Sequence, residues 1–71
     1  MTMSRIYTLT LYPTADVVRK IVALWYDESL ECELTVGKRD GERFVTVSYS
    51  NPEALNRILK VAKGGIIKIT K

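Results

Sequence analysis

The sequence predicts an α+β fold in which a four-stranded antiparallel sheet carries two helices on one face. A β-hairpin pattern runs from Leu30 to Ser50, and its two arms alternate between apolar and polar residues. One helical pattern precedes this hairpin, a second follows it, and single strand patterns begin and end the chain. The element order is therefore β-α-β-β-α-β, and residues 1–71 are expected to form a single domain.

The hairpin is the element that the sequence specifies best. Its turn is expected over Gly37–Glu42 with Asp40-Gly41 at the centre, because both of these residue types tolerate positive φ. With this turn, three apolar pairs fall opposite one another on one face: Val36 with Val45, Leu34 with Val47, and Cys32 with Tyr49. A loop longer or shorter by one residue would bring residues of opposite faces together.

The first strand is expected over Arg5–Tyr12, and Pro13 ends it. Thr14 can cap the following helix, and Asp16 suits the positive end of its dipole. The helix is expected to end near Asp27. Its apolar stripe comprises Val17, Val18, Ile21, Leu24 and Trp25.

The second helix is expected to begin at Asn51-Pro52, as N-cap and first helical residue, and to stop at Gly64-Gly65. Its inner stripe comprises Ala54, Leu55, Ile58 and Ala62. A last strand is expected over Ile66–Thr70, with Ile67 and Ile69 directed inward.

Right-handed crossovers turn this order into the ferredoxin-like arrangement, with the first and third strands in the middle of the sheet. The second and fourth strands are then its edges. The face without helices is expected to carry Ile6, Thr8, Thr10, Tyr12, Glu31, Glu33, Phe44, Thr46, Ser48 and Lys68.

The composition narrows the setting in which the chain works. One cysteine and no histidine argue against an internal disulfide and a zinc site, and they favour a reducing, cytoplasmic compartment. No run is long enough to span a membrane, and residues 1–5 lack the apolar stretch of a signal peptide. The net charge is +3, but the basic residues are scattered, so neither a membrane nor nucleic acid is expected as a partner.

The sequence contains no catalytic constellation, so we expect no enzyme, no catalytic residues, no metal and no cofactor. Glu31 and Glu33 form a carboxylate pair on an edge strand, where charge protects the edge from aggregation. Cys32 lies in an apolar row and is expected to be a small buried hydrophobe.

Two binding functions outside catalysis stay open. Phe44 and Tyr12 lie on the open face of the two middle strands, where RNA-recognition modules stack bases. Glu42 stands where such modules carry another aromatic residue. The alternatives are therefore a small RNA-binding module using the open sheet face, or a partner-binding protein of unassigned target.

The segment Phe44–Lys71 resembles the second half of an ACT domain. It has a strand, a short polar turn, a helix beginning near Glu53-Ala54-Leu55, and a closing Gly65-Ile66-Ile67-Lys68-Ile69. Leu34-Thr35-Val36-Gly37, after a helix that contains Leu24-Trp25, is similar to the ACT domain of the acetolactate (acetohydroxyacid) synthase small regulatory subunit. The resemblance covers nearly the whole chain.

This resemblance implies a non-catalytic regulatory or interaction subunit of an amino-acid biosynthetic enzyme, with a larger catalytic subunit as its partner. It also implies an amino-acid effector, of the branched-chain type. The effector-binding residues would be Tyr12, Pro13, Thr14, Ala15, Leu30, Glu31 and Cys32. Ala15 stands where effector-binding members carry a glycine, so a subunit that activates its enzyme without an effector stays open.

A homodimer is expected through the second strand, because a domain this small gains stability by association. Antiparallel pairing of two copies would extend the sheet to eight strands. A register centred on Glu33 would oppose two carboxylates, whereas registers centred on Cys32 or Leu34 avoid that opposition. The fourth strand, with Lys68 and Lys71, is the less suitable edge.

Overall fold

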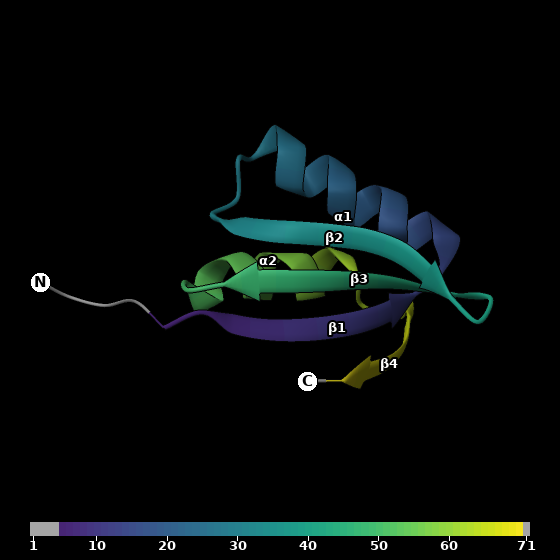
Figure 1. Ribbon diagram of the computed structural model, residues 1–71. Coiled ribbons are helices and arrows are strands. Elements are labelled where there is room, and N and C mark those ends of the chain that lie inside the picture. Colours follow the sequence, from purple (N-terminus) through teal and green to yellow (C-terminus); the bar gives the residue numbers. More distant parts are fainter. Residues whose placement is uncertain (1–4, 71) are drawn as a thin grey trace, which may run out of the picture.

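The computed structural model describes residues 5–70, so the expectations for residues 1–4 and for Lys71 lie outside the described residues. The fold is α+β, with four antiparallel strands in the order β2-β3-β1-β4 and two helices (Figure 1). The prediction that the first and third strands lie in the middle is confirmed. The elements are β1 (Tyr7–Pro13), α1 (Ala15–Asp27), β2 (Cys32–Arg39), β3 (Glu42–Tyr49), α2 (Pro52–Val61) and β4 (Ile66–Thr70).

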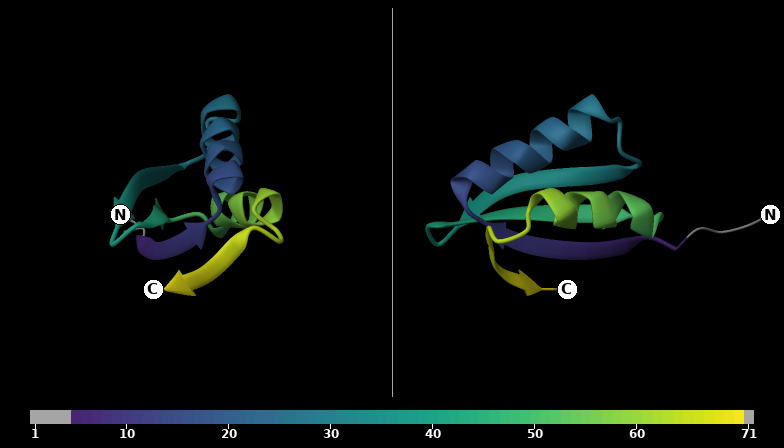
Figure 2. Two further views of the ribbon diagram at one scale, coloured as in Figure 1. Left: turned by 90° about the vertical axis from the view of Figure 1, so that its right-hand side faces the viewer. Right: turned by 180° about the vertical axis from the view of Figure 1, so that it is seen from behind.

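Both helices cover the same face of the sheet, and the other face is open (Figure 2). The core lies between these two layers, and the predicted inner stripe of α2 is buried in it. The fully buried side chains are Leu11 from β1, Ile21 from α1, Val45 and Val47 from β3, and Ile58 and Ala62 from α2 and its C-cap.

The hairpin has the predicted register. Val36 pairs with Val45, and the pairing continues without a shift from Arg39 and Glu42 at the loop to Cys32 and Tyr49. Asp40 and Gly41 form a two-residue loop with φ values of 52° and 82°, which is shorter than the predicted turn because Gly37–Arg39 and Glu42 belong to the paired strands. These positive values explain why Asp-Gly occurs there, since most other residues would be strained.

Both helices begin at the predicted capping residues. The hydroxyl oxygen of Thr14 accepts a 3.4 Å hydrogen bond from the backbone N–H of Val17. The side-chain oxygen of Asn51 accepts a 3.0 Å bond from the backbone N–H of Glu53. These bonds satisfy N–H groups that have no acceptor within the first helical turn, which fixes where each helix starts.

The prediction that Ile67 points inward is wrong, because its side chain is 77% exposed. The pairing of β1 with β4 shifts between Tyr12 and Pro13, so Ile67 is an extra residue without a partner. Ile69 pairs with Leu11 on the helix-covered face, yet it is 50% exposed because it lies at the edge of the sheet. The helices therefore leave the β4 edge uncovered.

The β2 edge is also uncovered. Among the described residues no strand lies beside the outer edge of β2, and α1 crosses above β2 at an angle (Figures 1 and 2). Val36 on this edge is 49% exposed, although its partner Val45 is fully buried. On the outer side of α1, Tyr26 is 78% exposed and Val22 is exposed as well. An apolar strip thus follows α1 and the outer edge of β2.

Candidate functional site

The seven predicted effector-binding residues fall into two groups that lie at opposite ends of the sheet. Cys32 pairs with Tyr49 at one end of β3, whereas the register of β1 places Tyr12 beside Phe44 at the other. Five residues of strand separate the two positions, which is about 17 Å. One chain therefore does not bring the two groups together, and Leu30–Cys32 lies near the C-terminal end of α1 instead of its N-terminal end.

The first group surrounds the start of α1. Thr14 is committed to the fold, because its hydroxyl caps the helix and its N–H donates a 2.9 Å bond to the carbonyl oxygen of Gly65. Pro13 is buried, and Ala15 is half-buried. The ring of Tyr12 lies on the open face, where the ammonium group of Lys68 is 4.5 Å from the ring centroid.

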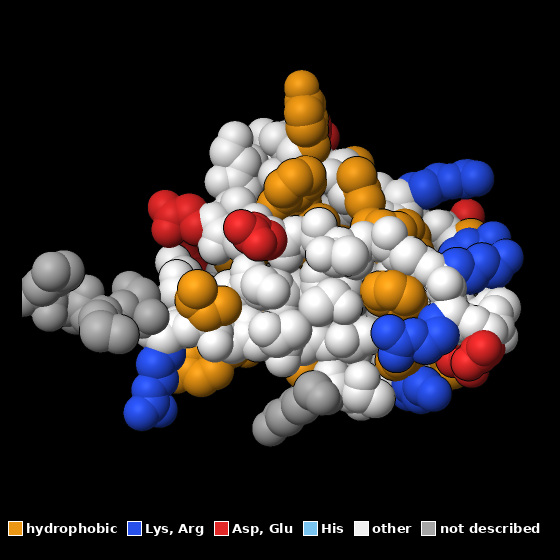
Figure 3. All heavy atoms as spheres, viewed as in Figure 1, with side chains coloured by type: hydrophobic (Ala, Val, Ile, Leu, Met, Phe, Trp, Pro, Cys, Tyr) orange, Lys and Arg blue, Asp and Glu red, His pale blue; other side chains and the backbone are white. Residues whose placement is uncertain are grey.

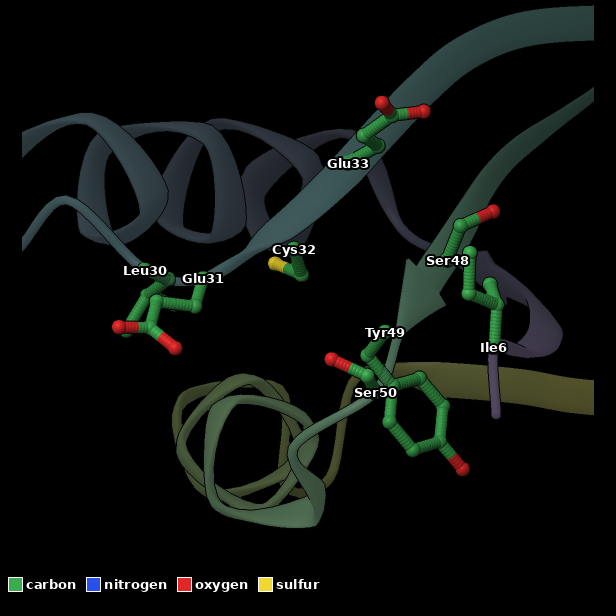
Figure 4. A pocket seen from close by; sticks show the side chains of 8 residues that line it. All are labelled: Ile6, Leu30, Glu31, Cys32, Glu33, Ser48, Tyr49 and Ser50. Atoms are coloured by element: carbon green, nitrogen blue, oxygen red, sulfur yellow. The ribbon is translucent and has the colours of Figure 1, made fainter. Parts of the chain in front are cut away.

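The second group lines a hollow of about 420 Å³ at the start of β2. Leu30 and Glu31 lie on one side of it, and Tyr49 and Ile6 lie on the other (Figure 4). The backbone carbonyl oxygen of Cys32 accepts a 2.8 Å hydrogen bond from the indole N–H of Trp25. Burial raises the pKa of the Cys32 thiol, so this sulfur is a poor nucleophile near neutral pH.

A second hollow, of about 400 Å³, lies between the first turns of α1 and the hairpin end of β2 and β3. Its lining residues are Ala15, Val18, Arg19, Val36, Gly37, Lys38 and Arg43. Of these, only Ala15 was among the predicted site residues. The predicted hairpin register contains a signal that points to it, because that register places Lys38 directly opposite Arg43, so two like charges occupy paired positions.

Charge is distributed unevenly along the molecule. Lys and Arg side chains gather over the end that carries the β2–β3 loop, where some acidic side chains lie as well, and further acidic side chains lie where β2 begins (Figure 3). The strand β2 and the residue before it carry this polarity in sequence: Glu31 and Glu33 come first, and Lys38 and Arg39 come last. All four residues are exposed.

The open face has the predicted aromatic residues, but cations already lie close to both of their rings. The guanidinium carbon of Arg39 is 5.7 Å from the ring centroid of Phe44, and the ammonium group of Lys68 makes a similar cation–π contact with the ring of Tyr12. The ring of Phe44 also lies against Gly37, where a Cβ would come within 2.6 Å of it. Next to these rings, one row of threonines crosses the sheet: Thr35, Thr46, Thr10 and Thr70.

Within residues 5–70, no three His, Cys, Asp or Glu side chains lie together as the ligands of a metal ion would. None of the helices in the described part of the chain is long and apolar enough to cross a membrane. No protein-family model matches the sequence, and no curated protein matches it.

Proposed function

We propose that this protein is a non-catalytic regulatory or interaction subunit with a ferredoxin-like fold of the ACT type. The catalytic partner we propose is an amino-acid biosynthetic enzyme such as acetolactate synthase. The strand order β2-β3-β1-β4 and the placement of both helices on one face support this fold. The resemblance in sequence supports the choice of enzyme.

The uncovered β2 edge is the observation that carries this proposal. A two-residue hairpin loop is closed by a hydrogen-bonded pair, here Arg39 with Glu42, and such pairs alternate along the ladder. The N–H and C=O groups of Thr35 therefore point toward β3, whereas those of Leu34 and Val36 point outward.

The order of charges along this edge favours antiparallel pairing with a second copy. Antiparallel pairing brings the acidic beginning of one β2 beside the basic end of the other. Parallel pairing would instead place Glu33 beside Glu33 and Lys38 beside Lys38, which is unfavourable. The apolar strip on α1 would meet its own copy along the same interface and would then be removed from water.

The register of this pairing follows from the charges. A register centred on Cys32 avoids opposing two copies of Glu33, but it places Glu31 opposite Glu33. A register centred on Leu34 leaves Glu33 opposite Thr35 without a charged partner. A register centred on Thr35 places Glu31 opposite Arg39 of the second copy and continues the threonine row across the interface. We therefore propose the register centred on Thr35.

This dimer would unite the two groups of predicted effector residues. In the proposed register, Cys32 of the second copy lies opposite Lys38, which lines the hollow beside Ala15. The segment Leu30–Cys32 of one copy would thus close the open side of the hollow of the other. A ligand at this position would contact both chains, so its binding could be coupled to assembly.

The partner enzyme is tested by capture followed by reconstitution. The tagged protein is incubated with native extract, and the recovered proteins are identified by mass spectrometry. We expect a thiamine-diphosphate-dependent acetolactate synthase, whose purified catalytic subunit gains activity when the protein is added. Recovery of RNA in place of an enzyme, or a recovered synthase whose activity does not change, would reject this function.

Effector binding is a separate question, and calorimetry addresses it with leucine, isoleucine and valine. Heat from one of them at millimolar concentration would identify an amino-acid-responsive subunit. Absence of heat, together with activation of the synthase, would identify a subunit that activates without a branched-chain effector.

A further inference from the structure

The hollow between α1 and the hairpin end has a volume and a charge that suit a small ligand. It is lined by side chains from α1, β2 and β3, all of which belong to one chain. Its volume of about 400 Å³ lies within the range of small-molecule sites. It therefore depends neither on the proposed dimer nor on the proposed regulatory role.

Three cationic side chains line this hollow: Arg19, Lys38 and Arg43. Lys38 and Arg43 are directly opposite one another on adjacent strands, an arrangement that is unfavourable unless an anion lies between or beside them. Among the described residues, no carboxylate lines the hollow, and Asp16 and Asp40, which are close in sequence, do not contribute to it. The ion pairs found within residues 5–70 involve other cations, namely Arg57 and Lys68.

Part of the lining of the hollow is apolar. Val18 from α1 and Val36 from β2 contribute to it, and Gly37 adds no side chain. Val36 is half exposed, so an apolar group placed over it would be removed from water. The hollow thus combines a cationic rim with an apolar surface.

We propose that this hollow binds a small organic dianion, such as a phosphate monoester with an apolar body. The dianion would lie among the three cations, where charge-assisted hydrogen bonds are strong, and its apolar body would cover Val18 and Val36. A free amino acid suits this hollow less well. Its carboxylate would be held, but its ammonium group would face three cations without an acidic partner in the same chain.

The ligand class can be tested by titrating the ¹⁵N-labelled protein and following backbone amide shifts by NMR. Three probes separate the chemical features: phenyl phosphate has the dianion and an apolar body, inorganic phosphate has only the anion, and leucine is a zwitterion. We expect saturable shifts at Ala15, Gly37 and Lys38 with phenyl phosphate, weaker binding of inorganic phosphate, and no saturation with leucine. Leucine binding as tightly as phenyl phosphate would overturn the proposal.

Variants show whether these cations hold the dianion. Lys38→Gln and Arg43→Gln should each weaken phenyl phosphate binding about tenfold. Lys60→Gln removes the same charge from an exposed position on α2 and should leave the affinity unchanged. Equal weakening by all three variants would show a non-specific charge effect and would contradict the site.

A lipid headgroup could present the same phosphate chemistry, and vesicles distinguish that source. The protein is sedimented with phosphatidylcholine vesicles that contain or lack phosphatidic acid. We expect it to stay in the supernatant in both cases, because the hollow has room for a small free ligand. Binding to phosphatidic acid vesicles that Arg43→Gln abolishes would overturn the proposal of a free ligand.

Discussion

The indole N–H of Trp25 donates a 2.8 Å hydrogen bond to the backbone carbonyl oxygen of Cys32. The carbonyl oxygen of Trp25 in turn accepts a 3.2 Å bond from the N–H of Leu30. Ser29, between them, has a φ of 48°, which a residue other than glycine adopts only at a cost. Trp25 therefore fixes the connection from α1 to β2 through both its side chain and its backbone.

Replacing this tryptophan should loosen the connection. Trp25→Phe keeps an aromatic ring but leaves the carbonyl oxygen of Cys32 without its donor, which should lower the free energy of unfolding by about 1–3 kcal/mol. Urea denaturation followed by circular dichroism measures the change. Tyr26→Phe is the matched control, because Tyr26 is exposed and should tolerate the change. Equal stability of Trp25→Phe and the unmodified protein would contradict the role given to this bond.

A second prediction concerns the contact with α1 made by Gly65, the residue before β4. A Cβ on Gly65 would lie 2.1 Å from the Cγ2 of Val17, and Val17 is buried and β-branched, so it cannot easily move away. Gly65→Ala should therefore destabilise the protein by about 1–3 kcal/mol. The same substitution in a Val17→Ala background should cost clearly less, because the clashing methyl group is gone. Additive costs in this double-mutant cycle would show that the clash is not the cause.

The hairpin and the helix starts could be predicted because their signals are local. Asp40-Gly41 fixes the loop, and the apolar alternation allows only one register around it, so two independent features agree. The orientation of Ile67 could not be predicted in this way. The bulge that exposes Ile67 arises where Pro13 ends β1. The residues Ile66–Thr70 alone do not indicate where the partner strand ends, so their pattern does not predict the bulge.

The candidate site shows a similar limit. The resemblance assigns Leu30–Cys32 and Tyr12–Ala15 to one binding site. The directions of β1 and β2 in the sheet place these two segments at opposite ends of β3, so they do not meet within one chain. The cationic hollow was missed for a different reason. Lys38 and Arg43 were paired by the predicted register, but the contribution of Arg19 depends on how α1 crosses the sheet, and a helical pattern does not specify that angle.

The thiol of Cys32 should make stability depend on alkaline pH. Burial raises its pKa in the folded state, so the unfolded thiol ionises first as the pH rises. Its contribution to stability is therefore complete below the unfolded-state pKa and declines as the pH rises toward the folded-state pKa. The stability difference between the unmodified protein and Cys32→Ser should shrink above about pH 8.5. A difference in urea midpoint that stays constant from pH 7 to pH 10 would contradict this prediction.

The last prediction uses the charge polarity of β2 to test the proposed dimer. One variant reverses the acidic end, with Glu31→Lys and Glu33→Lys, and the other reverses the basic end, with Lys38→Glu and Arg39→Glu. All four residues are exposed, so each variant should keep the fold, which circular dichroism can verify.

Either variant alone would bring like charges together in the antiparallel pairing, and its self-association should weaken about tenfold or more. An equimolar mixture should restore dimers, because one uniformly basic edge then meets one uniformly acidic edge. Sedimentation equilibrium at tens of micromolar measures all three samples, with Lys60→Glu at an exposed position of α2 as the control for a charge change away from the edge. A monomeric unmodified protein, or variants that dimerise as well alone as when mixed, would show that β2 does not form the interface.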